Sequence, residues 1–153
     1  MNLEAKLKEM GLELPEPPNP MASYVRAVKS GNLLFISGQI PFVKGVIKYK
    51  GKLGSHLTVE EGYEAARVCA LNVLSIVKAE VGDLEKIERI VKLTGYVNSS
   101  SGFTDQPKVL NGGSELFSQL LGEKGKHARV AVGVNELPLD AAVELEVIVE
   151  VRD

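Results

Sequence analysis

Arg129 is the residue of this chain whose setting best suits binding of a small anion. It lies in a run that alternates with period 2, so the sequence predicts a β-strand there. One face of that strand carries valines and the other carries Arg129, Ala131 and Gly133. Small neighbours leave space above a sheet, and a guanidinium in such a space can pair bidentately with a carboxylate. An exposed arginine on a half-buried strand has the same pattern, and the pattern alone favours that plainer interpretation.

Glu144 is the candidate acid–base group. It is the second residue of another alternating run, residues 143–151. One face of that run carries Glu144, Glu146 and Glu150. The pattern alone favours an exposed acidic face made of the three glutamates, although a carboxylate at such a place could accept a proton from an attacking water. The short connection Leu137–Asp140 predicts that the two runs form a β-hairpin. Its register decides whether Arg129 shares a face with Glu144 or with Val143 and Leu145.

Two further sets of residues combine small and polar side chains. Ser37, Gly38 and Gln39 follow the apolar run 33–36, where a strand end can present amides and a hydroxyl to a ligand. A bulge or tight bend at the glycine explains the same residues equally well.

The second set is Asn111, followed directly by Gly112 and Gly113 inside an amphipathic pattern. Each interior glycine costs on the order of 1 kcal/mol of helix stability relative to alanine. Either the helix begins near Ser114, or the chain packs there too closely for side chains. Asn111 is accordingly either a helix cap or a polar group held at a crowded place.

The totals describe one ordinary globular domain. The chain has 153 residues, 44% hydrophobic and 25% charged, and a formal net charge of −2. That charge gives no electrostatic reason to expect nucleic acid or an acidic membrane as partner. No apolar run approaches the length of a membrane span of about 20 residues, and no secretory h-region is evident, so a cytoplasmic protein is expected.

The chain also offers little for binding a metal. The one cysteine, Cys69, lies on an apolar helical stripe, which favours a core residue over a nucleophile. The two histidines, His56 and His127, are far apart in the sequence. A cofactor-poor protein without a metal site is therefore the starting expectation.

The order of elements predicts an α+β domain at residues 21–153, preceded by an arm at residues 1–20. In the arm, Asn2 can cap a short helix that Gly11 ends, before a connector rich in proline. The most secure helix begins with the capping box Thr58–Glu61 and ends at Gly82. The remaining elements are expected as strands at 24–29, 33–36, 46–49 and 90–97, a helix from a Thr104 cap to Gly122, and the two final strands.

Several separated motifs, in order between Tyr24 and Val151, resemble the YjgF/RidA family of enamine/imine deaminases, formerly called L-PSP endoribonuclease-like proteins. These motifs are Ser37-Gly38-Gln39-Ile40-Pro41, Asn111 with Glu115-Leu116-Phe117, Ala128-Arg129, Leu137-Pro138, and Val143-Glu144-Leu145-Glu146. The resemblance implies a chorismate-mutase-like fold, a mixed six-stranded sheet with two helices on one face. It also implies a homotrimer with ligand clefts between its subunits.

The same resemblance implies roles for individual residues. Arg129 would grip the substrate carboxylate and Glu144 would help to place water, while the cleft would be lined by Tyr24, Ser37, Gly38 and Asn111. The substrates would be 2-aminoacrylate and related enamines or imines, hydrolysed without a cofactor to 2-keto acids and ammonia. Holding a carboxylate and orienting one water suit this chemistry, because a protonated imine is already electrophilic.

Two departures from the family pattern keep other functions open. Ala131 stands where the family often has a cysteine, and the N-terminal extension and the connection 43–58 differ from compact members. A non-catalytic trimer that binds small carboxylates as a sensor or scaffold is the alternative. Endoribonuclease activity ranks third, because the sequence has no basic stripe, aromatic stacking motif or histidine pair.

Overall fold

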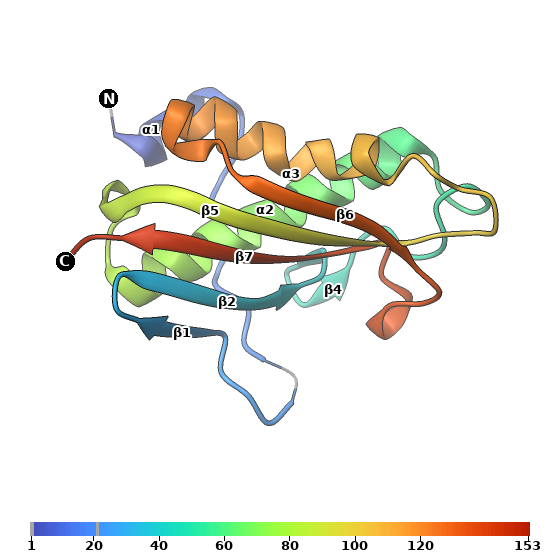
Figure 1. Cartoon of the computed structure of the whole chain (residues 1–153), viewed down its shortest axis with the longest axis horizontal. Helices are drawn as coiled ribbons and strands as arrows, with labels where there is room; N and C mark the ends of the chain where they lie inside the picture. Colours follow the sequence, from blue (N-terminus) through green and yellow to red (C-terminus); the bar gives the residue numbers. More distant parts are fainter. Residues whose placement is uncertain (1, 21) are drawn as a thin grey trace.

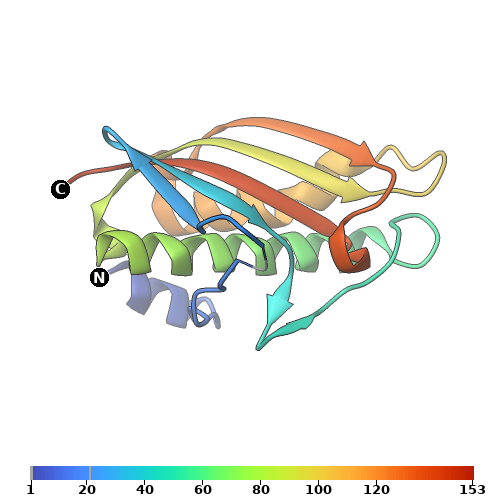
Figure 2. The ribbon, with the colours of Figure 1, turned by 90° about the horizontal axis from the view of Figure 1, so that it is seen from below.

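The computed structural model describes residues 2–20 and 22–153. It shows a mixed five-stranded sheet with helices on one face (Figures 1 and 2). The spatial order of its strands is β1-β2-β7-β5-β6. Their bounds are β1 Ala27–Ser30, β2 Leu33–Gln39, β7 Val143–Val151, β5 Ile87–Asn98 and β6 Ala128–Val134. Neighbouring strands are antiparallel except β5 and β6, which run parallel. The α+β class and the mixed sheet predicted from the sequence are therefore confirmed.

The number of strands in that sheet differs from the expected six. The predicted strand at residues 46–49 is shortened to β4 Val46–Ile47, which pairs with β3 Phe42–Val43 in a separate two-stranded ribbon. Lys44 and Gly45 join these strands with positive φ angles of 51° and 79°, so the chain reverses sharply there and leaves the main sheet.

The predicted hairpin of the last two strands is wrong. β7 pairs with β5 and β2, and β6 pairs only with β5, so β5 lies between the two supposed hairpin strands. The connection contains the 3-10 helix η3 Pro138–Asp140, whose Leu139 and Asp140 both have positive φ. It carries the chain across the end of β5 rather than directly back beside β6.

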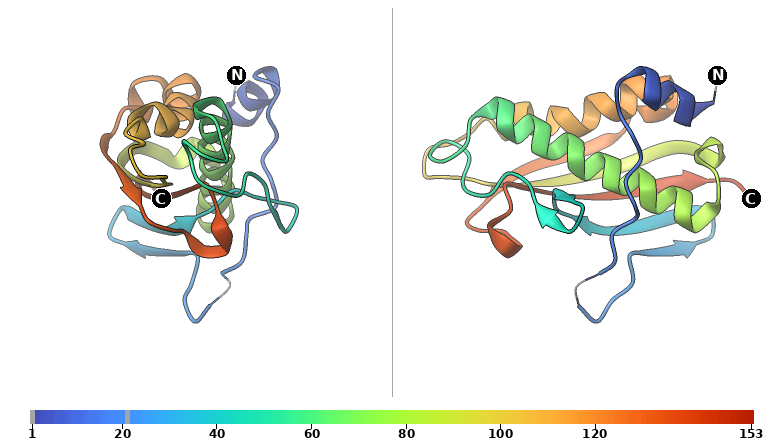
Figure 3. Two further views of the ribbon diagram at one scale, coloured as in Figure 1. Left: turned by 90° about the vertical axis from the view of Figure 1, so that its right-hand side faces the viewer. Right: turned by 180° about the vertical axis from the view of Figure 1, so that it is seen from behind.

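Helices α2 Val59–Val81 and α3 Gln106–Leu121 lie side by side on one face of the sheet (Figure 3). The capping box of Thr58 and Glu61 is present, and Gly82 ends α2 in the left-handed conformation, as predicted. The predicted Thr104 cap of α3 is wrong. Asp105 occupies that position without a side-chain hydrogen bond, and Pro107 lies in the first turn as expected.

The two glycines inside α3 reflect close packing. The helix runs through both, so it does not begin at Ser114. A Cβ added at Gly112 would overlap the carbonyl group of Tyr63 on α2, and one at Gly113 would come within 3.0 Å of Leu145 Cδ1. Glycine at position 112 therefore lets α3 approach the backbone of α2. This confirms the alternative in which the chain packs there too closely for side chains.

The arm is ordered against the domain over its described residues. Helix α1 Leu3–Glu9 begins at Asn2, whose side chain accepts a hydrogen bond from the Ala5 amide, and Leu7 is buried. The proline-rich connector then passes over α2 and reaches the edge of the sheet near β1 (Figure 3, right). The arm is thus a packed element of the fold.

The prediction that Cys69 is a core residue is confirmed. It is fully buried among the apolar residues between the helices and the sheet, and burial raises the pKa of its thiol well above the usual value. Among residues 2–20 and 22–153, no helix is long and apolar enough to cross a membrane.

Within residues 2–20 and 22–153, no helix lies on the other face of the sheet (Figure 2). Strand register places Val28, Phe35, Val130 and Val132 on it. Each of these large apolar side chains is between 39% and 55% exposed. This open face is more apolar than a solvated sheet surface needs to be.

Candidate functional site

A pocket of about 400 Å³ lies where β2 ends and β7 begins. Four of the six residues expected at the site line it: Tyr24, Ser37, Gly38 and Glu144. They come from the segment before β1, the end of β2 and the start of β7. Three elements far apart in the sequence therefore build one site.

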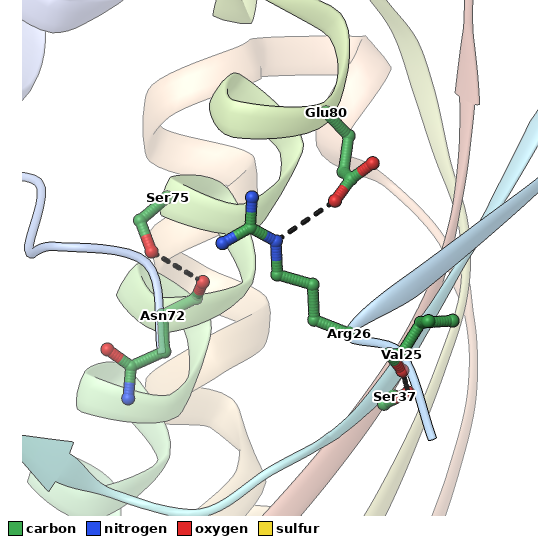
Figure 4. Close-up of polar contacts among 6 residues, drawn as sticks. All are labelled: Val25, Arg26, Ser37, Asn72, Ser75 and Glu80. Atoms are coloured by element: carbon green, nitrogen blue, oxygen red, sulfur yellow. Dashed lines mark hydrogen bonds and ion pairs between the residues drawn. The ribbon is translucent and has the colours of Figure 1, made fainter. Parts of the chain in front are cut away.

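Ser37 and Gly38 form a β-bulge that opens the pocket. The register between β2 and β7 shifts between Ile36 and Gln39. The Ser37 hydroxyl donates to the Val25 carbonyl at 2.6 Å and so fixes the segment that carries Tyr24 (Figure 4). A Cβ on Gly38 would come within 3.0 Å of Glu144 Cδ. The bulge interpretation of this glycine is confirmed, and the missing side chain at Gly38 leaves room for the Glu144 carboxylate.

Glu144 is a half-buried carboxyl group with a perturbed acidity. Burial, and next the negative charge of Glu146, raise the pKa of Glu144 above its ordinary value. Tyr96 donates to Glu146 at 2.8 Å, so the second carboxylate is held on the same face. A carboxyl with a raised pKa is a better proton acceptor than an exposed glutamate.

Arg26 contributes the cation of the pocket wall. Its Nε donates to Glu80 Oε1 of α2 at 3.0 Å, which ties the start of β1 to the end of that helix (Figure 4). The ion pair is partly exposed, so it adds little to stability but fixes the direction of the side chain.

Arg129 and Asn111, the other two expected residues, lie away from this pocket. Arg129 is on the edge strand β6 and points toward α3, where its Nη1 donates to Asn111 Oδ1 at 2.9 Å and to Ser114 Oγ at 3.2 Å. Asn111 is therefore a polar anchor within α3 and not a helix cap.

Arg129 and Glu144 are on opposite faces of the sheet. Arg129 is opposite Leu93 of β5, which is opposite Val147, so Arg129 shares the helix-covered face. Glu144 is opposite Tyr96, on the open face. Three positions of β5 separate Leu93 from Tyr96, about 10 Å along the strand, and two strand spacings add a further 9–10 Å or so across the sheet. Within one chain, these two groups cannot act on the same small molecule.

Sequence reasoning missed Ser114 and His127. His127 Nδ1 lies 2.7 Å from the Gly125 carbonyl, which can only accept, so Nδ1 carries the proton. In the neutral ring Nε2 then accepts from the Ser114 hydroxyl at 2.8 Å, and the Ser114 oxygen accepts from Arg129. The signal was available, because a hydroxyl three residues after Asn111 lies on the same side of a helix.

The residues that the structure describes contain no group of three or more histidine, cysteine or acidic side chains close enough to hold a metal ion.

The chain is thus an α+β domain with helices on one face of a mixed sheet and a pocket where β2 ends and β7 begins. The chain belongs to the YjgF/RidA family. The family model described as "YjgF/chorismate mutase-like, putative endoribonuclease" matches residues 4–151.

Individual relatives agree with this membership. Protein TCP17 of Trypanosoma cruzi is 47% identical over 97% of this chain and 94% of its own length. The crystal structure of Atu1372 from Agrobacterium tumefaciens superposes with a TM-score of 0.93 at 46% identity, covering 98% of this chain and 92% of that one. A relative from Dermatophagoides farinae, named 2-iminobutanoate/2-iminopropanoate deaminase, is 29% identical over 92% of this chain and 95% of its own.

Proposed function

We propose that this protein hydrolyses reactive 2-imino acids and their enamine tautomers to 2-keto acids and ammonia, without a cofactor, in clefts shared by neighbouring subunits. The observation that carries the proposal is Glu144, a desolvated carboxyl that faces a pocket beside the bulge of Ser37 and Gly38. Family membership and the name of the Dermatophagoides farinae relative support the reaction class.

In this reaction an enamine first tautomerises to the imine, whose protonated form is attacked by water at the imine carbon. Glu144 accepts a proton from that water as the carbon–oxygen bond forms, which gives a carbinolamine. The proton moves from Glu144 to the nitrogen, and the carbon–nitrogen bond breaks as the hydroxyl group passes its proton to Glu144. A keto acid and ammonia leave, and the ammonia takes that proton to become ammonium. Arg129 of an adjacent chain pairs with the substrate carboxylate throughout and so fixes the imine carbon near Glu144.

The sharing of the cleft is argued from position. Arg129 is on the edge strand β6, where a neighbouring chain can reach it, and Glu144 of its own chain lies on the opposite face. The open face carries Val28, Phe35, Val130 and Val132, which a neighbouring sheet would cover. We propose a homotrimer in which the open faces meet and each Arg129 enters the pocket of the next chain.

The family description also mentions endoribonuclease, but this pocket suits a polyanion poorly. Its cation Arg26 is paired with Glu80, and Glu144 would repel a phosphate. Ribonuclease activity is therefore not proposed.

A coupled assay tests the proposal. A serine or threonine dehydratase generates the imine, and keto-acid release is followed with and without this protein and its Arg129→Ala variant. Release should be faster with the wild type and close to the buffer rate with the variant. If the wild type binds 2-keto acids through Arg129 but gives no acceleration, the protein is instead a carboxylate-binding sensor or scaffold, which Ala131 in place of the frequent cysteine would suit.

A further inference from the structure

The pocket beside Glu144 has a polar end and a larger apolar end. The polar end consists of Asn19, Tyr24, Arg26, Ser37, Gly38, Gln39 and Glu144. The apolar end is built by the arm, the residues after β2 and the 3-10 helix η3. Its side chains are those of Pro18, Pro20, Ala22, Ile40, Phe42, Pro138 and Leu139.

The volume of the pocket exceeds what the smallest imines need. At about 400 Å³ it falls in the range of sites that hold ligands far larger than 2-aminoacrylate, a molecule the size of alanine. In the proposed reaction the carboxylate and imine groups need only the polar end. The apolar end is thus available to a substrate side chain.

One wall of the apolar end is fixed by a buried amide. Asn72 of α2 is almost fully buried, and its Nδ2 donates to the Ile40 carbonyl at 3.3 Å and the Phe42 carbonyl at 3.1 Å. Ser75 donates to the Asn72 carbonyl at 2.8 Å, one turn further along the same helix (Figure 4). Phe42 is therefore held at the pocket by the helix layer.

The opposite wall presents Leu139 in an unusual backbone conformation. Leu139 has a backbone φ of +57° and Asp140 a φ of +58°. Residues other than glycine, asparagine and aspartate rarely adopt such values, so Leu139 is the unusual one. The fully buried Asn98 donates to Asp140 Oδ1 at 3.2 Å and to the Ala141 carbonyl at 3.1 Å, and it accepts from Lys52 Nζ at 2.9 Å. This network holds η3 in place while Leu139 stays 49% exposed at the pocket.

We propose that this end of the pocket binds the apolar side chain of the substrate, so that the preferred substrates are 2-imino acids with branched aliphatic or aromatic side chains. Leu139 and Phe42 are the specificity-determining residues. The inference rests on the proposed function because it takes the imino acids to be substrates. The same binding preference applies to the product keto acids. Burial of each methylene group should improve affinity about threefold to fourfold.

Calorimetry on the full chain tests this preference independently of turnover. Pyruvate, 4-methyl-2-oxopentanoate and phenylpyruvate are titrated into wild type, Leu139→Asn and Val46→Asn. Asparagine tolerates the left-handed conformation, so Leu139→Asn removes apolar surface without new strain. Val46 is 67% exposed on the ribbon strand β4 and does not line the pocket, so it is the matched control.

The two larger keto acids should bind at least about tenfold more tightly than pyruvate. Leu139→Asn should reduce that ratio at least threefold with pyruvate unchanged, and Val46→Asn should leave it unaltered. Equal affinities, no binding by any keto acid, or a ratio unaffected by Leu139→Asn would overturn the inference.

The coupled dehydratase assay separates the two proposals. Size-dependent binding without imine hydrolysis removes the proposed function and keeps the pocket assignment. Hydrolysis without size-dependent binding keeps the proposed function and removes the pocket assignment.

Discussion

Arg129 and Glu144 lie on opposite faces of one sheet, with strand β5 between their strands. The guanidinium is anchored under α3, and the carboxyl faces a pocket on the open side. If both act on one substrate, they must come from different chains.

Glu144→Gln should abolish imine hydrolysis and at the same time stabilise the fold at neutral pH. The raised pKa means that the native state binds a proton more readily than the unfolded state. Stability therefore falls as pH rises from the ordinary value of 4.5 through the raised pKa, and it stays lower above that window. Removal of the charge should raise Tm by about 1–3 °C at pH 7.5 and by nothing near pH 4. Thermal unfolding across pH measures this, and an unchanged or lower Tm at pH 7.5 would contradict it.

The same shift sets the acid limit of activity. Glu144 must be ionised to accept a proton, so kcat/KM should fall on the acid side at a pH above the ordinary carboxyl range. The Glu146→Gln variant should move that limit to lower pH, because it removes a negative charge that raises the pKa of Glu144. A limit that stays in place in Glu146→Gln would be evidence against Glu144 as the base.

Ser114→Ala should weaken binding of keto acids about threefold to tenfold, because Arg129 loses one of its two anchors and the link to His127. Ser114→Thr keeps the hydroxyl and should restore most of the affinity. Ser118→Ala, the same change one turn later on α3, is the control. The effect should be larger on KM than on kcat, and equal effects of the two alanine variants would exclude a positioning role for Ser114.

Val132→Glu should convert the assembly to monomers, since it places a charge on the apolar open face that neighbouring chains would cover. Light scattering after size-exclusion chromatography measures the mass. Val46→Glu, on the separate ribbon, should leave the mass unchanged. A wild type that is already monomeric at micromolar concentration would contradict the shared cleft.

The sequence allowed the local elements to be predicted where the signal is local. The capping box of Thr58 and Glu61 and the left-handed Gly82 depend on a few adjacent residues, so the bounds of α2 follow from the sequence alone. Pairing of strands is different, because alternation describes the two faces of a strand and not its neighbours. Nothing in residues 128–151 reveals that β5 comes between β6 and β7.

Part of the candidate site could be predicted from the sequence, and part could not. Ser37, Gly38 and Glu144 could be named from the family resemblance, and the structure brings them to one pocket with Tyr24. The resemblance gave no indication of the apolar end. Pro18 and Leu139 reach it only through the path of the arm and the network of Asn98, which are tertiary features.

The central claim is that each catalytic cleft combines Arg129 of one chain with Glu144 of another. Arg129→Ala and Glu144→Gln chains are co-expressed with different tags, and mixed oligomers are isolated and assayed for imine hydrolysis. Each variant alone should be inactive. Each isolated mixed trimer should contain one complete cleft and so have about one third of the wild-type activity, since a complete cleft needs the intact Arg129 and the intact Glu144 from two different chains. Mixed oligomers with no activity above the single variants would contradict the account.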